Sequence, residues 1–234
     1  MALPKLQQPI FEIKIPSTGK KVNYTPFTVK EEKILLIAQE SKDTDQIILA
    51  IKQILNNCLH DVVVEDLAVF DLEYLLLNLR AQSVNNTLSF SIKDPETEEE
   101  IPLEIDIKEI DVVFNPEHTG TIHIDDNTVL KMRYPTANQL KDIIALAEGN
   151  DTDKMFDMMT SCFDALGTSE DTYKFDEYSK EEILEFTDGM SSGTVQEIRK
   201  FFETMPSMHY EKKYKNSKGE EKTFMVKGTE TFFI

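Results

Sequence analysis

One short stretch of this chain has the spacing of a hydrolase nucleophile. Gly189-Met190-Ser191-Ser192-Gly193 satisfies the pattern G-x-S-x-G, in which a tight turn presents a serine hydroxyl for acyl transfer. Such a turn must follow a β-strand, whereas the residues before Gly189 carry apolar side chains at helical spacing. The chain has four histidines, and no familiar motif places one as a base beside Ser191. The pattern therefore indicates a link between two helices, and an unrecognised hydrolase is the distant alternative.

Two acidic regions contain residue types that bind metal ions. His118 and His123 lie close in sequence to Asp125 and Asp126, and imidazole and carboxylate groups are common metal ligands. Polar positions in a strand and a turn explain these four residues equally well. The acidic run at residues 94–100 lacks the glycine and the ligand spacing of a calcium loop, which favours a solvated turn. We therefore expect no catalytic residue, no metal site and no cofactor.

The charge balance excludes several kinds of partner. The 234 residues include 43 Asp and Glu against 25 Lys and Arg, for a formal net charge of −18. Such a surface repels phosphate backbones and anionic lipid, so we expect neither nucleic acid nor a membrane as partner. Self-association stays open.

The N-terminus and the cysteines predict a cytosolic protein. The first residues lack the apolar core of a signal peptide, and no stretch of about 18 apolar residues is present. Cys58 and Cys162 fall on the apolar faces of two predicted helices, as reduced and buried thiols do in a reducing compartment.

Capping chemistry recurs along the chain at one offset. Thr28 with Glu31 and Thr136 with Gln139 have capping-box spacing, and the two pairs are 108 residues apart. Asp43-Thr44-Asp45 recurs as Asp151-Thr152-Asp153 at the same offset. Several features in one order at one offset predict an internal duplication.

The pattern of apolar residues predicts an α+β fold with two related halves, each with β-hairpins flanking a small helical bundle. We place the halves at 1–116 and 117–234, with the boundary near Asn115-Pro116. The expected elements are a hairpin over 11–24, helices over 28–41, 44–58 and 67–79, a hairpin over 88–107, a hairpin over 122–134, a helix after Thr136, a helix over 155–166 with Gly167 as its C-cap, helices opened by Ser179 with Glu182 and by Thr194 with Glu197, and a hairpin over 210–226.

Several segments carry a family resemblance: Ala2-Leu3-Pro4-Lys5, Pro16-Ser17-Thr18-Gly19-Lys20, Pro26 to Lys33, Phe70 to Tyr74, and the C-terminal Gly228 with Phe232-Phe233. They resemble the baseplate hub assembly proteins of T4-like contractile-tailed bacteriophages, best over about the first 110 residues. Many relatives carry C-x-x-C-G in the last hairpin. The matching turn here, Lys215 to Gly219, contains no cysteine, so a zinc role is not carried over.

The resemblance implies a non-enzymatic protein that assembles the central baseplate hub or forms part of it. Its partners would be other baseplate, hub or tail subunits, and it would be found in the host cytoplasm during assembly and, as a retained subunit, in the virion tail baseplate. A tail-tube or tape-measure assembly chaperone is the near alternative, and the resemblance does not decide between a retained subunit and a departing chaperone.

The C-terminus is the expected partner-binding site. Phe232, Phe233 and Ile234 place three apolar side chains at the end of an acidic chain, and Lys212, Lys213 and Lys215 lie shortly before them. Buried aromatic side chains are frequent anchors of protein interfaces. We expect the apolar tail either to dock on the helix that carries Phe201 and Phe202 or to fill a pocket on a hub subunit, with the lysines as a basic rim.

Overall fold

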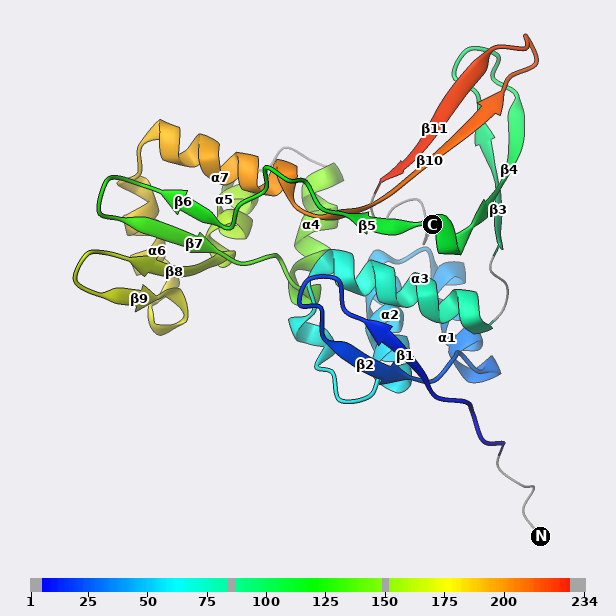
Figure 1. Cartoon of the computed structure of the whole chain (residues 1–234), viewed down its shortest axis with the longest axis horizontal. Helices are drawn as coiled ribbons and strands as arrows, with labels where there is room; N and C mark the ends of the chain where they lie inside the picture. Colours follow the sequence, from blue (N-terminus) through cyan, green and yellow to red (C-terminus); the bar gives the residue numbers. More distant parts are fainter. Residues whose placement is uncertain (1–5, 84–86, 149–151, 228–234) are drawn as a thin grey trace. The chain divides into compact units, whose positions relative to one another are not determined.

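The structure, a computed structural model, describes residues 6–83, 87–148 and 152–227 (Figure 1). The predicted α+β class is confirmed: helices and small antiparallel sheets occur together along the described chain. The elements are β1 (Phe11–Lys14), β2 (Lys21–Tyr24), α1 (Val29–Ser41), α2 (Thr44–Cys58), α3 (Val69–Ser83), β3 (Thr87–Lys93), β4 (Glu100–Asp106), β5 (Asp111–Val113), β6 (Thr121–His123), β7 (Val129–Met132), α4 (Leu140–Glu148), α5 (Thr152–Ser161), β8 (Phe163–Gly167), β9 (Thr172–Lys174), α6 (Lys180–Asp188), α7 (Ser192–Thr204), β10 (Ser207–Lys215) and β11 (Glu221–Lys227), with short 3-10 turns between some of them.

The chain divides into two compact units. Unit 1 combines Met1–Val113 with Ser207–Ile234, and unit 2 is Phe114–Pro206. The division expected from the sequence, 1–116 and 117–234, put the last hairpin with the second half. In the structure β10 pairs antiparallel with β5, Ser207 opposite Val113 and His209 opposite Asp111, so the hairpin extends a sheet of unit 1. This long-range backbone pairing leaves no local signal in the sequence.

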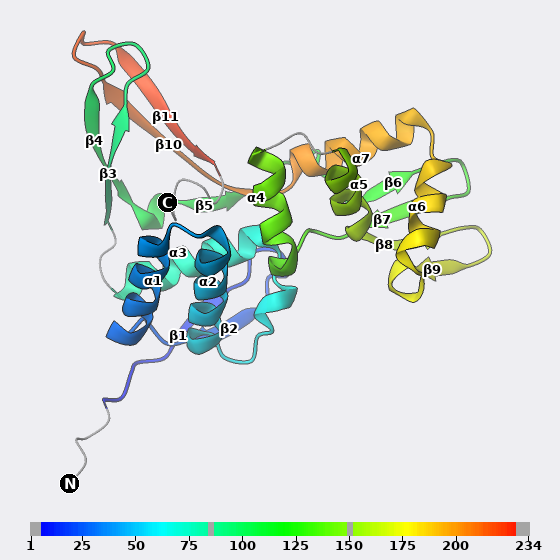
Figure 2. The ribbon, with the colours of Figure 1, turned by 180° about the vertical axis from the view of Figure 1, so that it is seen from behind.

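The core of unit 1 is centred on α3, which buries side chains around most of its circumference. Leu72, Leu75 and Leu79 are fully buried, and α1 and α2 lie side by side in the same unit (Figure 2). The helix α1 begins with the predicted capping box, because Thr28 accepts from the first turn while the Glu31 carboxylate accepts from the Thr28 N–H. Burial of these leucines supplies the main stabilisation, at about 1.5–3 kcal/mol for each side chain.

A buried carboxylate joins α3 to the β1–β2 turn. Asp71 is fully buried and accepts hydrogen bonds from the Ser17 N–H at 2.8 Å and the Ser17 hydroxyl at 2.5 Å. Burial raises the pKa of Asp71, while the hydrogen bonds from Ser17 and from the Ala68 N–H oppose that rise. The turn is therefore tied to the helix at the centre of the unit.

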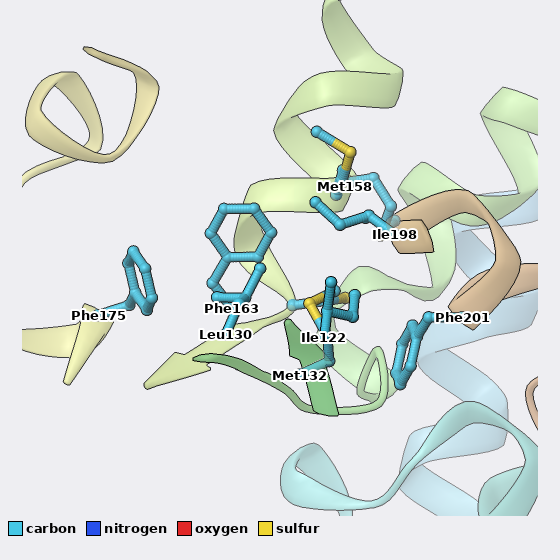
Figure 3. Close-up of a cluster of buried hydrophobic side chains, with 10 residues drawn as sticks. Ile122, Leu130, Met132, Met158, Phe163, Phe175, Ile198 and Phe201 are labelled. Carbon is cyan, nitrogen blue, oxygen red and sulfur yellow. The ribbon is translucent and has the colours of Figure 1, made fainter. Parts of the chain in front are cut away.

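Unit 2 has a four-stranded sheet in the order β6-β7-β8-β9, with α4, α5, α6 and α7 in the same unit. Its core gathers side chains from the strands and from α5 and α7, among them Leu130, Phe163, Ile198 and Phe201, which are buried (Figure 3). Phe163 and Phe175 meet edge to face with ring centroids 5.1 Å apart. Aromatic pairs of this geometry add stabilisation beyond their buried area.

Two predicted helix limits in unit 2 are wrong. The helix expected over 155–166 ends at Ser161, and Phe163 to Gly167 form β8 instead, with Phe163 opposite Met132 and Leu166 opposite Leu130. These residues form a strand because they pair with the edge of β7 that β6 leaves free. The sequence does not predict this, because a short apolar run is compatible with either a strand or a helix. The last helix begins at Ser192 rather than after Thr194, because Ser191 is the N-cap and accepts from the Thr194 N–H.

The two segments with repeated capping chemistry share their local geometry. Each consists of a hairpin, a capped helical segment, a second helix and a return to the hairpin strand, as Thr25 N–H donates to Cys58 O and Arg133 N–H to Cys162 O. In each segment, the side chain of the third residue of the capping box, Glu31 or Gln139, also forms a hydrogen bond with the residue that precedes the cysteine. Asn57 Nδ2 donates to Glu31 at 3.2 Å, and Gln139 Nε2 donates to the Ser161 hydroxyl at 2.5 Å. A common origin of the two halves stays a prediction.

Candidate interaction surface

Two hairpins of unit 1 rise side by side, β3–β4 and β10–β11 (Figures 1 and 2). They belong to separate sheets, and side chains join them. The Tyr214 hydroxyl donates to Asp94 Oδ2 at 2.9 Å, and Lys222 Nζ lies 2.5 Å from the Glu96 carboxylate. Nearer the base, the Tyr210 hydroxyl donates at 2.9 Å to Glu109, which lies in the 3-10 turn after β4. We call this pair of joined hairpins the twin hairpins.

Asp94 organises the tip of the twin hairpins. Its side chain is fully buried and accepts from the Glu96 N–H, the Thr97 N–H and the Thr97 hydroxyl, in addition to Tyr214. Burial would raise the pKa of Asp94, but these hydrogen bonds outweigh burial and lower it. The acidic run was expected to be a solvated turn. That holds for Glu98, which is exposed, but not for Asp94.

The turn between β10 and β11 is closed by an amide side chain. Asn216 is buried, its Oδ1 accepts from the N–H groups of Lys218 and Glu220, and its Nδ2 donates to the Glu220 carboxylate at 3.0 Å. Gly219 takes a φ of +80°, which favours glycine. Hydrogen bonds thus close the turn that the family resemblance associates with cysteines. Among the described residues, no group of His, Cys, Asp and Glu has the geometry of a metal site.

The structure separates the three lysines of the expected basic rim. Lys213 and Lys215 are exposed on one face of β10, and Lys212 is half-buried on the opposite face, which also carries Tyr210 and Tyr214. Lys213 Nζ lies 3.3 Å from the Glu221 carboxylate of the neighbouring strand. The other expected partner-binding residues, Phe232, Phe233 and Ile234, lie outside the described residues.

The residues considered for catalysis and metal binding have structural contacts instead. Ser191 caps α7 and follows α6, so the strand that a nucleophile turn requires is not the element before it. His118 stacks on Tyr134 and packs at a tilt against Phe201, with ring centroids 5.5 and 5.0 Å away, and its Nδ1 bonds the Thr204 hydroxyl at 2.9 Å. Burial lowers the pKa of His118, which keeps the ring neutral at pH 7.

His123, Asp125 and Asp126, the other residues considered for a metal, are exposed at the β6–β7 hairpin. Asp125 accepts from the Asn127 N–H within the turn. The predicted burial of both cysteines is confirmed. Burial raises the pKa of the Cys58 thiol to about 12 and that of Cys162 to about 11, so both are protonated at neutral pH.

The contact between Tyr214 and Asp94 was not predicted from the sequence. The two residues are 120 positions apart. The alternation of Tyr210 and Tyr214 on one face of the last hairpin is the only local signal that this face meets another element.

Comparison with known proteins gives one family. The family described as T4 bacteriophage base plate protein has a model that matches residues 8–234. Neither the curated proteins nor the solved structures that were searched gave a match. In the described part of the chain, no helix combines the length and the apolar character needed to cross a bilayer.

Proposed function

This chain belongs to the T4 bacteriophage base plate protein family, and from that membership we propose that it is a non-enzymatic protein that assembles the central baseplate hub or forms part of it. The observation that carries the proposal is the extent of the match, which reaches from residue 8 to residue 234 and so includes both units. The absence of a placed nucleophile and base around Ser191 supports a role through protein–protein contacts.

We propose the twin hairpins as the surface that meets a hub subunit. Their tips are held together by Tyr214 with Asp94 and Lys222 with Glu96, so the projecting strands are fixed before a partner binds. A contact surface ordered in advance loses less conformational entropy on association. Preorganisation of this kind suits a subunit whose task is to position other proteins.

The charge on the outer face favours an acidic patch on that partner. Lys213 and Lys215 stand exposed on a chain whose net charge is −18, and with Glu211 and Glu221 beside them this face is less acidic than the chain as a whole. Complementary charge increases the rate and the selectivity of association more than the affinity. In this proposal Phe232, Phe233 and Ile234 supply the apolar anchor of the same contact.

Mass spectrometry of purified virions of the encoding phage tests the hub role. A subunit that is retained gives its peptides at a constant ratio to the baseplate proteins. An assembly factor is absent from virions, but its loss stops baseplate formation. A phage that lacks the gene and still makes complete baseplates would refute both forms of the proposal.

Charge reversal tests the twin-hairpin surface. Lys213→Glu together with Lys215→Glu should reduce baseplate assembly while the melting temperature changes little, since exposed ion pairs contribute at most about 1 kcal/mol. Lys33→Glu with Lys200→Glu is the matched control, because both lysines are exposed and the net charge changes equally. An equal loss of assembly in both variants would show that net charge alone, and not this surface, matters.

Deletion of residues 230–234 tests the apolar anchor. Partner capture requires an unchanged melting temperature with lost assembly. Docking of the tail on its own core would lower the melting temperature instead. A truncated protein that melts normally and supports assembly would exclude both roles.

A further inference from the structure

Unit 2 contains a groove lined by methionines that the proposed hub surface does not use. It lies between α4, α5 and the end of α7 and has a volume of about 380 Å³. Four of the nine methionines of the chain line it: Met155, Met158, Met159 and Met205. Leu146 and Phe202 complete its apolar walls. Arg199 and Glu203 of α7 are its charged rim.

The groove is open, although its floor is part of the core. Met158 and Met159 are 8% and 4% exposed and belong to the buried cluster of unit 2, where Figure 3 shows Met158 close to Ile198. Met155 is 36% exposed, and Leu146, Phe202 and Met205 are half-buried. Apolar side chains on the wall therefore remain accessible to another molecule.

Methionine makes such a groove adaptable. Its side chain is unbranched, has three rotatable bonds and a polarisable sulfur, and fits differently shaped apolar groups at little cost. Grooves between helices commonly take an amphipathic helix, which inserts side chains spaced three and four residues apart. The lining thus favours an apolar helix face as the occupant.

The net negative charge of unit 2 favours basic residues on the polar face of the helix that would bind the groove. Residues 114–206 contain 19 Asp and Glu against 8 Lys and Arg. A basic segment is attracted by this excess and an acidic segment is repelled. We propose that the methionine-lined groove binds a basic amphipathic helix of another protein of the baseplate or tail. This proposal rests on the proposed function for its biological setting, and it names a class of partner at a second surface.

A direct binding measurement tests the groove independently of baseplate assembly. The probe is a synthetic peptide of about 18 residues, long enough to be helical, with leucine on one helical face and lysine on the other. The full-length protein is titrated with it at about 0.15 M salt, where the Debye length is about 8 Å and distant charges are screened. The control peptide has the same composition in an order without helical amphipathicity, so it keeps the charge and loses the apolar face.

Methionine methyl NMR locates the contact. We expect the amphipathic peptide to shift the methyl signals of Met155, Met158, Met159 and Met205. Met208 is buried in unit 1 and Met225 is exposed on β11, and both should stay unchanged. The scrambled peptide should bind at least tenfold more weakly.

A matched pair of variants tests the assignment. Met155→Glu places a carboxylate on the apolar wall and should weaken peptide binding at least tenfold, because the peptide would have to bury that charge. Met225→Glu makes the same change at a residue 61% exposed in unit 1 and should leave binding unaltered. Unchanged methyl signals in both variants outside the mutated residue would establish that the fold is intact.

Several outcomes would overturn the proposal. Equal binding of the two peptides, equal loss in the two variants, or shifts spread over all nine methionines would reduce the effect to general charge attraction. Concentration-dependent dimers that Met155→Glu abolishes would make a second copy of this chain the occupant. Failure of the peptide to bind, with a lower melting temperature for Met155→Glu, would mean that the chain itself covers the groove. None of these results bears on whether the protein acts in the hub.

Discussion

Removal of the Asp71 carboxylate gives a quantitative test of how unit 1 is held together. Asp71→Ala eliminates the acceptor for the Ser17 N–H and the Ser17 hydroxyl. A hydrogen bond to a charged group contributes about 1.5–3 kcal/mol, and relief of the buried charge offsets part of the loss of two. Because Ser17 is only half-buried, water reaches its freed donors. We expect a loss of about 2–4 kcal/mol from the free energy of unfolding of unit 1.

Two further variants separate hydrogen bonding from charge. Ser17→Ala removes only the hydroxyl donor and should cost about 1–2 kcal/mol, less than Asp71→Ala. Asp71→Asn retains an acceptor for the Ser17 N–H and removes the buried charge, so at pH 7 it should change stability by less than about 1 kcal/mol. The double variant with Ser17→Ala and Asp71→Ala should cost less than the sum of the single changes, since both remove one interaction.

The pH dependence of Asp71→Asn follows from the raised pKa of Asp71. The native state holds this proton more tightly than the unfolded state, whose carboxyl has the ordinary pKa of 3.8. Stability from this group is therefore full below 3.8 and is lost as the pH rises through the native pKa. The free energy of unfolding of Asp71→Asn, relative to that of the wild type, should therefore increase between pH 3.8 and the native pKa of Asp71 and should be constant at higher pH.

Hydrogen exchange measured by mass spectrometry is the appropriate assay, because the chain contains no tryptophan and has two units. Amides of α3 and β2 report the opening of unit 1, and amides of α5 and α7 provide an internal control. The reasoning would be refuted if Asp71→Ala left α3 protection unchanged. It would also be refuted if Asp71→Asn cost as much as Asp71→Ala, because acceptor geometry would then be irrelevant.

Three other predictions concern the hairpins, the thiols and metals. Tyr214→Phe should speed exchange at the 94–99 turn but not in α5. In the wild type, the stabilisation from the hydrogen bond between Tyr214 and the Asp94 carboxylate should be complete above pH 3.8 and should be lost as the pH falls through the lowered pKa of Asp94. Hydrogen exchange of the 94–99 turn, measured as a function of pH, tests this. Cys58 and Cys162 should resist a thiol reagent at pH 8 in the native protein and react after denaturation, since burial raises both pKa values to about 12 and 11; rapid native labelling would contradict their burial. EDTA should leave the melting temperature unchanged, because hydrogen bonds of Asn216 close the last turn, and a fall of several degrees that zinc or calcium reverses would reveal a metal site.

Local chemistry in the sequence predicted most elements of this fold. Thr28 with Glu31 and Ser179 with Glu182 form the expected capping boxes, because the residues that satisfy free N–H groups lie within three positions of them. The apolar stripe that ends at Cys58 likewise corresponds to α2. The errors occur where distant partners decide. Residues 163–167, predicted as helix, form a strand that pairs with β7. Residues 207–209, predicted to belong to the second half, pair with β5 of unit 1.

The candidate surface was predicted only in part for the same reason. A cluster of lysines is visible in the sequence, but the alternation of a strand places Lys212 on the opposite face from Lys213 and Lys215. The fixed tip depends on Tyr214 reaching Asp94 across 120 positions. The methionine groove gathers residues from three helices, of which Met155 and Met159 lie on a stripe that the sequence indicated as apolar, whereas Met158 was not predicted.

Because unit 1 combines segments that precede and follow unit 2, its completion depends on the order of synthesis. The strand β5 emerges from the ribosome with residue 113, while its partner β10 begins only at residue 207. At about 5–20 residues per second, β5 waits roughly 5–19 s for β10, and the whole of unit 2 is made in that interval. Unit 2 can therefore fold first, and a chain that stops before β10 leaves Asp94 without Tyr214 and β5 without a partner. Translation through β11 is thus a condition for the twin hairpins to exist, so products that stop earlier would lack the proposed hub surface.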